Sequence, residues 1–298
     1  MEATVIALGF FDGVHLGHGA LLRRAAEVAR EKGAKAAVFT FDRPPKEVVT
    51  GKTVYLINSA EERREMVKRY YGIEKVILAP FDEAMMHCSW ERFVEELLVK
   101  EHGAVHLVAG HDHRFGYKNE GTPALLQEKC AALGIGCDII PAVEVEGITV
   151  SSTHIRALLE AGKVEEAAKF LGHRHCLTQT VQHGYRVGRT IGVPTVNLIV
   201  PHNILTPALG VYTTRVYLPD GRDFAGVTNV GTRPTVSDSD AVSVETFLLD
   251  FDGDLYDQTI RVEFCCRLRG EKKFASLEEL RHEIQRNAEQ TREYFRNN

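Results

Sequence analysis

The chain has 298 residues, of which 44% are hydrophobic and 26% charged, a composition typical of a globular protein with one large or two medium domains. Its formal net charge of −5 excludes a general attraction to nucleic acid or to an anionic membrane, so any polyanionic ligand needs a local binding site. No apolar run approaches the roughly 18 to 20 residues of a membrane span, and the first residues do not resemble a secretion signal. We therefore expect a cytoplasmic protein with no nucleic-acid or membrane partner.

The first half of the chain predicts alternating strands and helices. Apolar runs predict strands at 5–8, 36–41, 76–80 and 105–109. Helix starts are indicated by three cap signals: Ser59 with Glu62, Ser89, and Thr122 followed by a proline. Two shorter helices are expected at 153–161 and 164–171, each followed by a glycine. This alternation is typical of a parallel sheet covered by helices on both faces.

After about residue 175 the pattern changes to a group of strands, several of them alternating in polarity. The expected strands lie at 177–183, 210–218, 224–229, 243–250 and 259–268. A closing helix is predicted after Ser276, which has Glu279 three residues on. This order favours an antiparallel barrel with a helix packed outside it. We predict one domain at 1–174 and a second at 175–298.

The six cysteines include no Cys-x-x-Cys pair, which argues against a disulfide framework or a zinc site. The triplet His111-Asp112-His113 is more typical of a polar loop than of a metal site.

A segment rich in glycine and histidine follows the first predicted strand and opens into a helix at 20–31. It reads Gly9-Phe10-Phe11-Asp12-Gly13-Val14-His15-Leu16-Gly17-His18. At the carboxyl end of a parallel strand, glycines let the backbone approach a phosphate closely, and a helix N-terminus offers free N–H groups. His15 and His18 can donate hydrogen bonds to phosphate oxygens as charge develops. The segment is neither a dinucleotide fingerprint nor a P-loop, and the simpler alternative is a glycine-rich turn with two surface histidines.

A second anion site is indicated at Val150-Ser151-Ser152-Thr153-His154-Ile155-Arg156. Hydroxyls and free N–H groups at a helix start can bind phosphate, and Arg156 can contact it with two nitrogens. A plain helix cap explains Ser152 and Thr153 equally well. Two anion sites suit a reaction in which ATP meets a phosphorylated acceptor, because many negative charges must be held at once.

Together these motifs resemble the FMN adenylyltransferase module of bacterial bifunctional riboflavin kinase/FMN adenylyltransferases, or FAD synthetases. The resemblance implies an α/β nucleotidyltransferase-type sheet, in which the FMN phosphate attacks the α-phosphorus of ATP and pyrophosphate is released. It implies that His15, His18 and Arg156 are catalytic. The implied nucleotide-binding residues of this half are Gly9, Phe11, Asp12, Gly13, Gly17, Ser152 and Thr153. Asp112 and Arg114, in a segment similar to the family's Asp-Phe-Arg-Phe-Gly, are the implied flavin contacts.

Three positions depart from the family pattern. Phe10 stands where the family usually has asparagine, and His113 stands where phenylalanine is expected near the flavin. The family's Phe-Asp-Pro-His-Pro reads Phe-Asp-Arg-Pro-Pro at 41–45, so a histidine is missing. These departures concern the flavin more than the phosphates.

The C-terminal half contains a second glycine-rich segment, Gly184-Tyr185-Arg186-Val187-Gly188-Arg189-Thr190-Ile191-Gly192-Val193-Pro194-Thr195-Val196-Asn197. Its glycines suit a backbone wrapped closely around a ligand. Thr195 and Asn197 are two apart, so in an extended segment their oxygens project to one side and can share a Mg²⁺ ion. A glycine-rich β-turn is the alternative.

This segment resembles the Gly-Arg-x-x-Gly-Phe-Pro-Thr-Ala-Asn signature of riboflavin kinases, and the segments 229–235 and 244–251 are similar to two further elements of that family. The resemblance implies a second ATP site at Gly184, Gly188, Arg189, Gly192 and Pro194, a metal site at Thr195 and Asn197, and flavin contacts at Asn229 and Arg233. Glu245 matches the catalytic carboxylate, which accepts the proton of the riboflavin hydroxyl. A solvated strand carboxylate is the alternative for Glu245.

These motifs predict an enzyme that phosphorylates riboflavin to FMN and then transfers AMP from ATP to FMN, giving FAD. Its expected ligands are ATP, riboflavin and FMN, with Mg²⁺ as cofactor; the oligomeric state is left open. A nucleotidyltransferase for another acceptor is the first alternative, but it leaves residues 184–250 unexplained. A flavin-binding sensor is the second, and it has no use for a general base.

Overall fold

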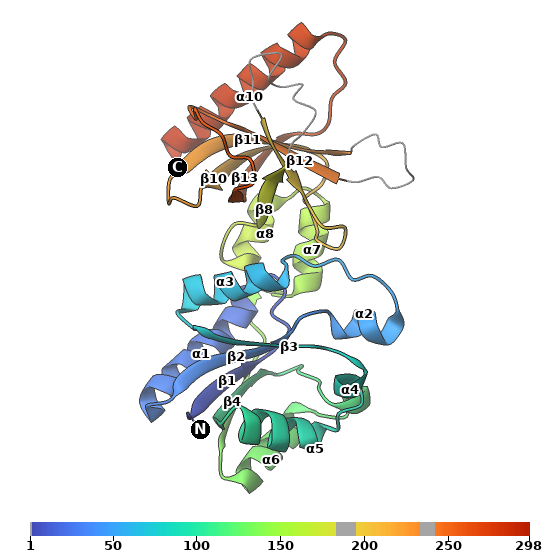
Figure 1. Ribbon diagram of the computed structural model, residues 1–298, viewed down its shortest axis with the longest axis vertical. Helices are drawn as coiled ribbons and strands as arrows, with labels where there is room; N and C mark the ends of the chain where they lie inside the picture. The colour runs from blue at the N-terminus through green and yellow to red at the C-terminus, as the bar shows by residue number, and fades with distance from the viewer. Residues whose placement is uncertain (1, 183–194, 233–241) are drawn as a thin grey trace. The chain divides into compact units, whose positions relative to one another are not determined.

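The computed structural model describes residues 2–182, 195–232 and 242–298, and Figure 1 shows the course of the chain. The chain divides into two compact units, Met1–Ser152 and Thr153–Asn298, each with its own sheet and core. The predicted domain boundary at 174/175 lies farther along, after two more helices, and it stays a prediction.

The first unit contains a parallel sheet in the order β3-β2-β1-β4-β5. Its strands are β1 (Thr4–Leu8), β2 (Lys35–Phe41), β3 (Lys75–Ala79), β4 (Ala104–Gly110) and β5 (Gly136–Ile140). Every residue of β1 is buried, which is why this central strand reads as an apolar run. The chain adds strands on one side of β1 as far as β3 and then on the other side, so the sheet reverses its order between β1 and β4.

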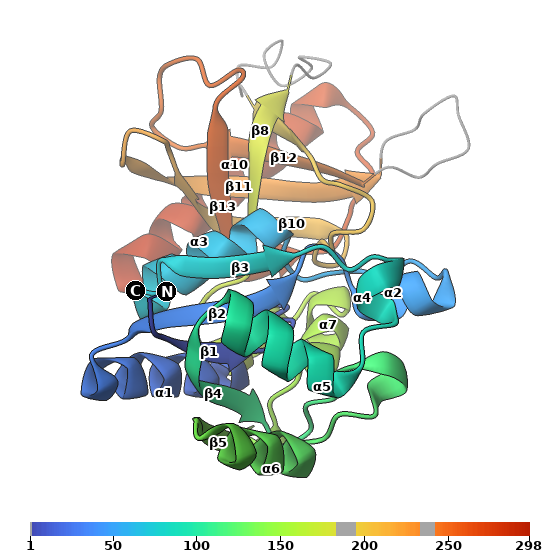
Figure 2. The same cartoon turned by 60° about the horizontal axis from the view of Figure 1, so that its bottom comes forward.

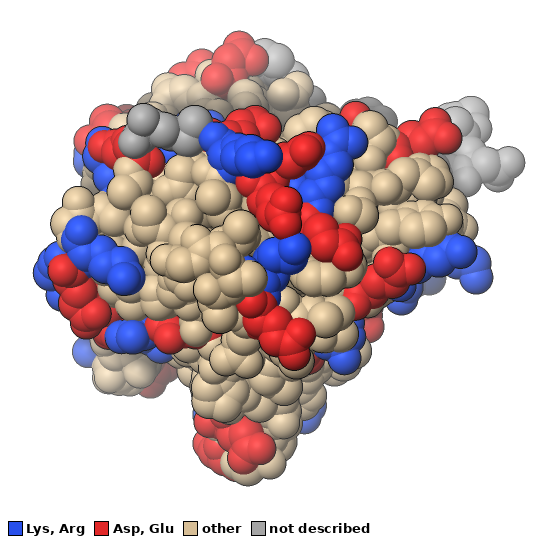
Figure 3. Space-filling view, turned by 90° about the horizontal axis from the view of Figure 1, so that it is seen from below, with Lys and Arg blue, Asp and Glu red and all other residues tan. Residues whose placement is uncertain are grey.

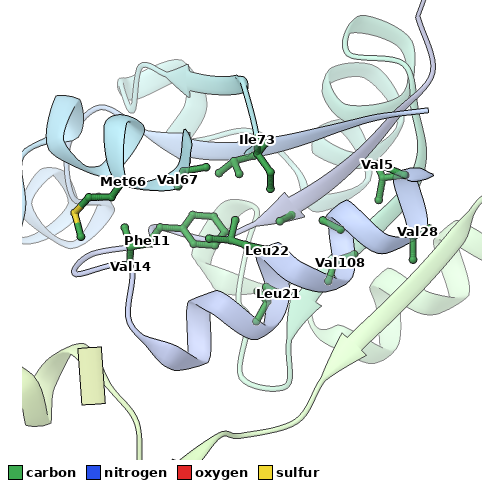
Figure 4. Packing of buried hydrophobic residues seen from close by; sticks show 14 residues of the cluster. Val5, Phe11, Val14, Leu21, Leu22, Val28, Met66, Val67, Ile73 and Val108 are labelled. Atoms are coloured by element: carbon green, nitrogen blue, oxygen red, sulfur yellow. The ribbon is translucent and has the colours of Figure 1, made fainter. Parts of the chain in front are cut away.

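Helices cover both faces of this sheet, as Figures 1 and 2 show. The helices of this unit are α1 (Leu16–Lys32), α2 (Pro45–Thr50), α3 (Ala60–Tyr71), α4 (Glu83–Met86), α5 (Trp90–Arg92), the π-helix η1 (Phe93–Glu101), the 3-10 helix η2 (Tyr117–Asn119) and α6 (Pro123–Leu133). Helices α1 and α3 share one core with Val5, drawn in Figure 4. Helices η1 and α6 share the opposite core with Ile6, because neighbouring strand residues point to opposite faces.

Local cap signals account for where several helices begin. The Ser59 hydroxyl accepts the N–H of Glu62 at 3.1 Å, and the Glu62 carboxylate accepts the N–H of Ser59 at 2.9 Å. This capping box confirms the predicted start of α3. The predicted caps Ser89 and Thr122 are confirmed as well, each accepting an N–H three residues on.

The second unit forms a closed antiparallel barrel, with its described strands in the order β10-β11-β12-β9-β8-β13. It begins with α7 (Ser152–Glu160) and α8 (Val164–Leu171). The strands are β8 (Cys176–Gln182), β9 (Thr195–Ile199), β10 (Gly210–Tyr217), β11 (Asp223–Thr232), β12 (Val242–Leu248) and β13 (Thr259–Arg269). Inside the barrel, three threonine hydroxyls form a chain of hydrogen bonds of 2.8 Å, from Thr214 to Thr228 to Thr246.

The outward residues of these strands face the closing helix α10 (Leu277–Asn297), which lies against the barrel in Figure 1. Val211 and Val227 pack with Ala288 of this helix. The predicted cap holds, because Ser276 accepts the N–H of Glu279 at 3.1 Å. The predicted fold class, a parallel α/β unit followed by a barrel with a C-terminal helix, is confirmed.

The sequence pattern does not predict β5, nor the hairpin of β6 (Glu144–Val145) and β7 (Ile148–Thr149). Strand β5 has only five residues, all half-buried, at the edge of the sheet. Its apolar signal is therefore too short to stand out from the preceding helix.

No helix among the described residues is both long and apolar enough to cross a membrane. On the face drawn in Figure 3, lysines and arginines lie among aspartates and glutamates rather than apart from them. That face therefore carries no strong field of a single sign.

Candidate active sites

The segment 9–18 leaves the carboxyl end of β1, and the segment 111–116 leaves the carboxyl end of the neighbouring strand β4. The order of the sheet reverses between these two strands. Open α/β sheets bind their ligands at this kind of switch point. Asp112 turns back over the end of β4, since a Cβ on Gly110 would lie 3.2 Å from its Oδ1 atom. Both predicted segments of the first site thus start from adjacent strand ends.

The turn after β1 has an unusual backbone. Phe11, Gly13 and Val14 have φ angles of 58°, 83° and 40°. Residues other than glycine rarely adopt this left-handed region. Burial of the two apolar side chains compensates for this strain, because Phe11 and Val14 are 1% and 0% exposed (Figure 4). The turn is therefore anchored in the core beneath α1 and not free to relax.

Asp12 ties this turn to the segment before α3. Its Oδ1 atom accepts the N–H groups of Ile57 at 2.9 Å and Asn58 at 3.3 Å. Its backbone carbonyl accepts the hydroxyl of Ser152 at 2.9 Å. The structure thus brings Asp12 and Ser152, 140 residues apart, into direct contact, although Asp12 acts here as a structural acceptor.

His15 and His18 form a stacked pair, with ring centroids 3.6 Å apart and planes 11° from parallel. His15 is the N-cap of α1, and its Nδ1 accepts the N–H of His18 at 3.2 Å. A neutral His15 ring must therefore carry its proton on Nε2. Burial holds the pKa of His18 well below 6.5, and the nearby His15 and Arg63 charges lower it further. His18 is therefore neutral near pH 7.

Gly17 is required by this stacked pair. A Cβ at Gly17 would lie 3.1 Å from the His15 ring and 3.8 Å from the carbonyl oxygen of Val150. A side chain here would push the His15 ring out of place. Gly9 is similarly close to a ring, since its Cβ would lie 3.0 Å from Phe11.

Three further predicted residues of the first site, Thr153, Arg156 and Arg114, lie outside the β1–α1 turn in the chain. Thr153 and Arg156 lie on α7, in the second compact unit; Thr153 is exposed and Arg156 half-buried. Arg114 is exposed and donates to the carbonyl oxygen of His113 at 3.2 Å. Burial lowers the pKa of His113 to about 4, and its ring stacks on Phe115 with centroids 5.4 Å apart. His113 therefore takes an aromatic role, as the phenylalanine expected there would.

In the second unit, strand register brings three predicted residues into one row. Glu245 on β12 lies opposite Asn197 on β9 and opposite Asn229 on β11. Residues directly opposite on neighbouring strands share a face of the sheet. Thr195 is two residues from Asn197 and lies on that same face. These four residues, Thr195, Asn197, Asn229 and Glu245, therefore share the outer wall of the barrel.

This wall opens into a cavity of about 310 Å³ between the barrel, the segment after β13 and α10. Thr195, Asn229 and Glu245 line it. Its other lining residues are Val211, Val227, Phe247, Arg269, Glu271, Lys272, Phe274, Leu280, Ile284 and Asn287. The cavity is walled by apolar side chains and also carries acidic and basic side chains. Small-molecule sites commonly combine apolar walls with a few polar groups.

Two family models match the chain, one described as FAD synthetase over residues 1–154 and one described as riboflavin kinase over residues 171–295. A bifunctional riboflavin kinase/FMN adenylyltransferase from Listeria monocytogenes is 34% identical, over 98% of this chain and 92% of its own length. Proteins of the same description are 36% identical in Pseudomonas fluorescens, over 95% of this chain and 90% of that one, and 35% identical in Escherichia coli K12, over 99% and 93%. The chain belongs to this family.

A solved structure, described as a macrolide-efflux protein from Streptococcus pneumoniae, matches with a TM-score of 0.86 at 32% identity. The match covers 98% of this chain and 94% of that one. The family resemblance and this likeness in fold therefore extend over both units.

Several of the predicted kinase residues lie outside the described residues: Gly184, Gly188, Arg189, Gly192, Pro194 and Arg233. Their roles stay predictions. Within the described part of the chain, no group of three or more His, Cys, Asp and Glu side chains is arranged to hold a metal. Thr195 and Asn197 instead offer a hydroxyl and an amide oxygen, hard donors that suit Mg²⁺.

Sequence reasoning missed two parts of these candidate sites. One is the segment 269–274 with the facing side of α10, which completes the cavity. Its signal is a charged run ending in Phe274, between a strand and a capped helix. The other is Arg63 on α3, whose guanidinium lies 4.2 Å from the centroid of the Phe10 ring. The Phe10 departure from the family pattern is thus accommodated by stacking on Arg63.

Proposed function

We propose that the protein phosphorylates riboflavin to FMN in its second unit and adenylylates FMN to FAD in its first. One observation carries the proposal: each of the two sheets of this family member carries its own set of predicted reactive residues. His15 and His18 stack at the switch point of the parallel sheet, and Glu245 lines the barrel cavity between Asn197 and Asn229. Because both reactions consume ATP, we also propose that the enzyme works in the cytoplasm.

In the kinase reaction, the Glu245 carboxylate accepts the proton of the riboflavin 5′-hydroxyl. The hydroxyl oxygen then attacks the γ-phosphorus of ATP, the bond to the β-phosphate oxygen breaks, and ADP leaves. We propose that the flavin occupies the cavity, where Phe274 and Ile284 offer apolar surface and Asn229 offers a polar contact. Thr195 and Asn197 would hold Mg²⁺, which supplies neutralising charge to the ATP phosphates.

In the adenylyl transfer, an FMN phosphate oxygen attacks the α-phosphorus of ATP, the bond to the β-phosphate breaks, and pyrophosphate leaves. The His15 and His18 rings donate N–H hydrogen bonds to oxygens that gain charge in the transition state. The N-terminus of α1 adds its free N–H groups and its dipole. Arg156 and the hydroxyl of Thr153 are proposed as further phosphate contacts.

The test is a turnover assay with riboflavin, ATP and Mg²⁺, followed by separation of the flavins by chromatography. FMN appearing first and FAD later is the expected result. FMN without FAD would refute the adenylyl transfer and leave the kinase, whereas no conversion at all would refute both. Replacing riboflavin with FMN tests the second reaction alone.

A further inference from the structure

Arg63 joins the carboxyl ends of two strands of the parallel sheet. Its guanidinium donates to the carbonyl oxygen of Phe10, just after β1, and at 2.9 Å to the carbonyl oxygen of Phe41, at the end of β2. It also donates to the Thr40 hydroxyl at 2.9 Å, which in turn donates to the Phe10 carbonyl at 3.0 Å. Arg63 therefore holds the start of the β1–α1 turn against the neighbouring strand.

This guanidinium is almost completely buried, with 1% of Arg63 exposed. None of the ion pairs among the described residues involves it, and Asp42 pairs instead with Arg43 at 3.6 Å. Burial lowers the pKa of Arg63 to about 10, against the opposing effect of Asp12 and Asp42, so the group stays charged at neutral pH. A buried cation without a bonded carboxylate is costly and needs a compensating anion.

The positive charge lies where the proposed reaction brings phosphates. Arg63 contacts Phe10 in the same turn that carries His15 and His18. Its field reaches the His18 ring, because it adds to burial and to His15 in lowering the pKa of His18. The Nε atom of Arg63 is buried without a hydrogen-bond partner among the described residues. The turn therefore has a fixed cation behind it.

We propose that Arg63 is a positioning residue for adenylyl transfer, which fixes the ends of β1 and β2 and supplies positive charge to the polyphosphate bound at the β1–α1 turn. The inference rests on the proposed function of the first unit. It explains why a charge is kept in the interior although no carboxylate of the described part of the chain forms an ion pair with it. Phosphates of the bound nucleotide add to the negative charge that Asp12 and Asp42 supply.

The experiment compares Arg63→Met, which removes the charge, with Arg63→Lys, which keeps it but loses the planar fork. Arg64→Met is the matched control, because Arg64 is the next residue of α3 and is exposed. FAD formation from supplied FMN is measured at fixed Mg²⁺, with pyrophosphate and, separately, adenosine as inhibitors. FMN formation from riboflavin in the same samples reports on the second unit.

We expect Arg63→Met to weaken inhibition by pyrophosphate about tenfold or more and inhibition by adenosine by less than about threefold. Arg63→Lys should retain pyrophosphate inhibition to within about threefold while kcat falls, and Arg64→Met should match the wild type. The inference is overturned if inhibition by pyrophosphate and inhibition by adenosine weaken equally, or if neither Arg63 variant changes inhibition or kcat. If Arg63→Met does not fold, Arg63→Lys is the deciding variant. An unchanged kcat in Arg63→Lys refutes the role, and so does an equal weakening of inhibition by pyrophosphate and by adenosine.

Failure of the proposed function has a different signature. In that case the wild-type protein itself makes no FAD from FMN and ATP. A wild type that makes FAD, with variants that behave like it, removes the role of Arg63 alone.

Discussion

Glu245 has an amide side chain opposite it on each neighbouring strand, Asn197 on β9 and Asn229 on β11. It is half-buried at the wall of the cavity, so it can reach a bound hydroxyl and still exchange its proton with solvent. Neither neighbour in this row is a cation that would pair with it and weaken it as a base. This environment suits a general base better than a structural ion pair.

Replacement of Glu245 by glutamine should lower the rate of FMN formation by about 10² to 10⁴, because the amide cannot accept the hydroxyl proton. FAD formation from supplied FMN should be unchanged, since that reaction is assigned to the other unit. Initial rates of both reactions on one protein preparation give the answer. An equal loss in both reactions would show that Glu245 supports the fold instead.

A buried histidine gives the second unit a pH dependence. His175 is 1% exposed and stacks on Phe264 with centroids 5.6 Å apart, and burial lowers its pKa to about 3. In the unfolded chain histidine takes up a proton below about pH 6.5, whereas the folded chain does not until about 3. The unfolded state therefore binds more protons in this window, and the free energy of unfolding falls as the pH falls.

Between pH 7 and pH 5, His175 alone should remove about 2 kcal/mol from the free energy of unfolding. In His175→Phe this decline should be smaller by that amount, whatever the packing change does at pH 7. Denaturant unfolding at pH 7 and pH 5 measures it, with His202→Phe at an exposed site as control. The same decline in wild type and His175→Phe would contradict the assignment.

At the scale of elements, residues at the start of α3 contact the β1–α1 turn as well as capping their own helix. Its capping box fixes Ser59 and Glu62, and the two residues before it bind the Asp12 carboxylate. Four residues after Ser59, Arg63 reaches the ends of β1 and β2. A single helix start thus supports the turn that carries both histidines.

Ser59→Ala should lower the free energy of unfolding of the first unit by about 1 kcal/mol, because one N–H at the start of α3 loses its acceptor. It should also slow FAD formation, since the segment that holds Asp12 is less constrained. Ser276→Ala removes the equivalent cap of α10 and should spare FAD formation, which makes it the matched control. Equal effects of both changes on FAD formation would mean that the start of α3 has no special role.

The cap signals of these elements were readable from the sequence because each is a hydrogen bond between residues three apart. Ser59, Ser89, Thr122 and Ser276 all cap the helices predicted for them. Strand β5 was not readable, because its five half-buried residues have no alternation of their own. What makes it a strand is its pairing with β4, which is a long-range contact.

At the scale of the whole molecule, the two sets of candidate residues are built on different sheets, one parallel and one a closed barrel. His18→Ala should abolish FAD formation and spare FMN formation, the reverse of Glu245→Gln. A mixture of the two single variants should then convert riboflavin and ATP to FAD, because FMN released by one chain can bind another. Chromatography of the mixture against each variant alone tests this. A mixture that stops at FMN would show that FMN must pass within one chain.

The sequence by itself determined the two-part architecture, the helix caps and the candidate reactive side chains, because periodicity, caps and motifs are properties of neighbouring residues. Only the tertiary structure decided which of these side chains meet. The row of Asn197, Glu245 and Asn229 depends on strand register, and the cavity beside it depends on how α10 packs. Helical spacing places Arg63 on the buried face of α3, three and four residues before Met66 and Val67, but which two strand ends it joins follows from packing. Contacts between distant parts of the chain are set by the summed burial of the whole core, and no local pattern encodes them.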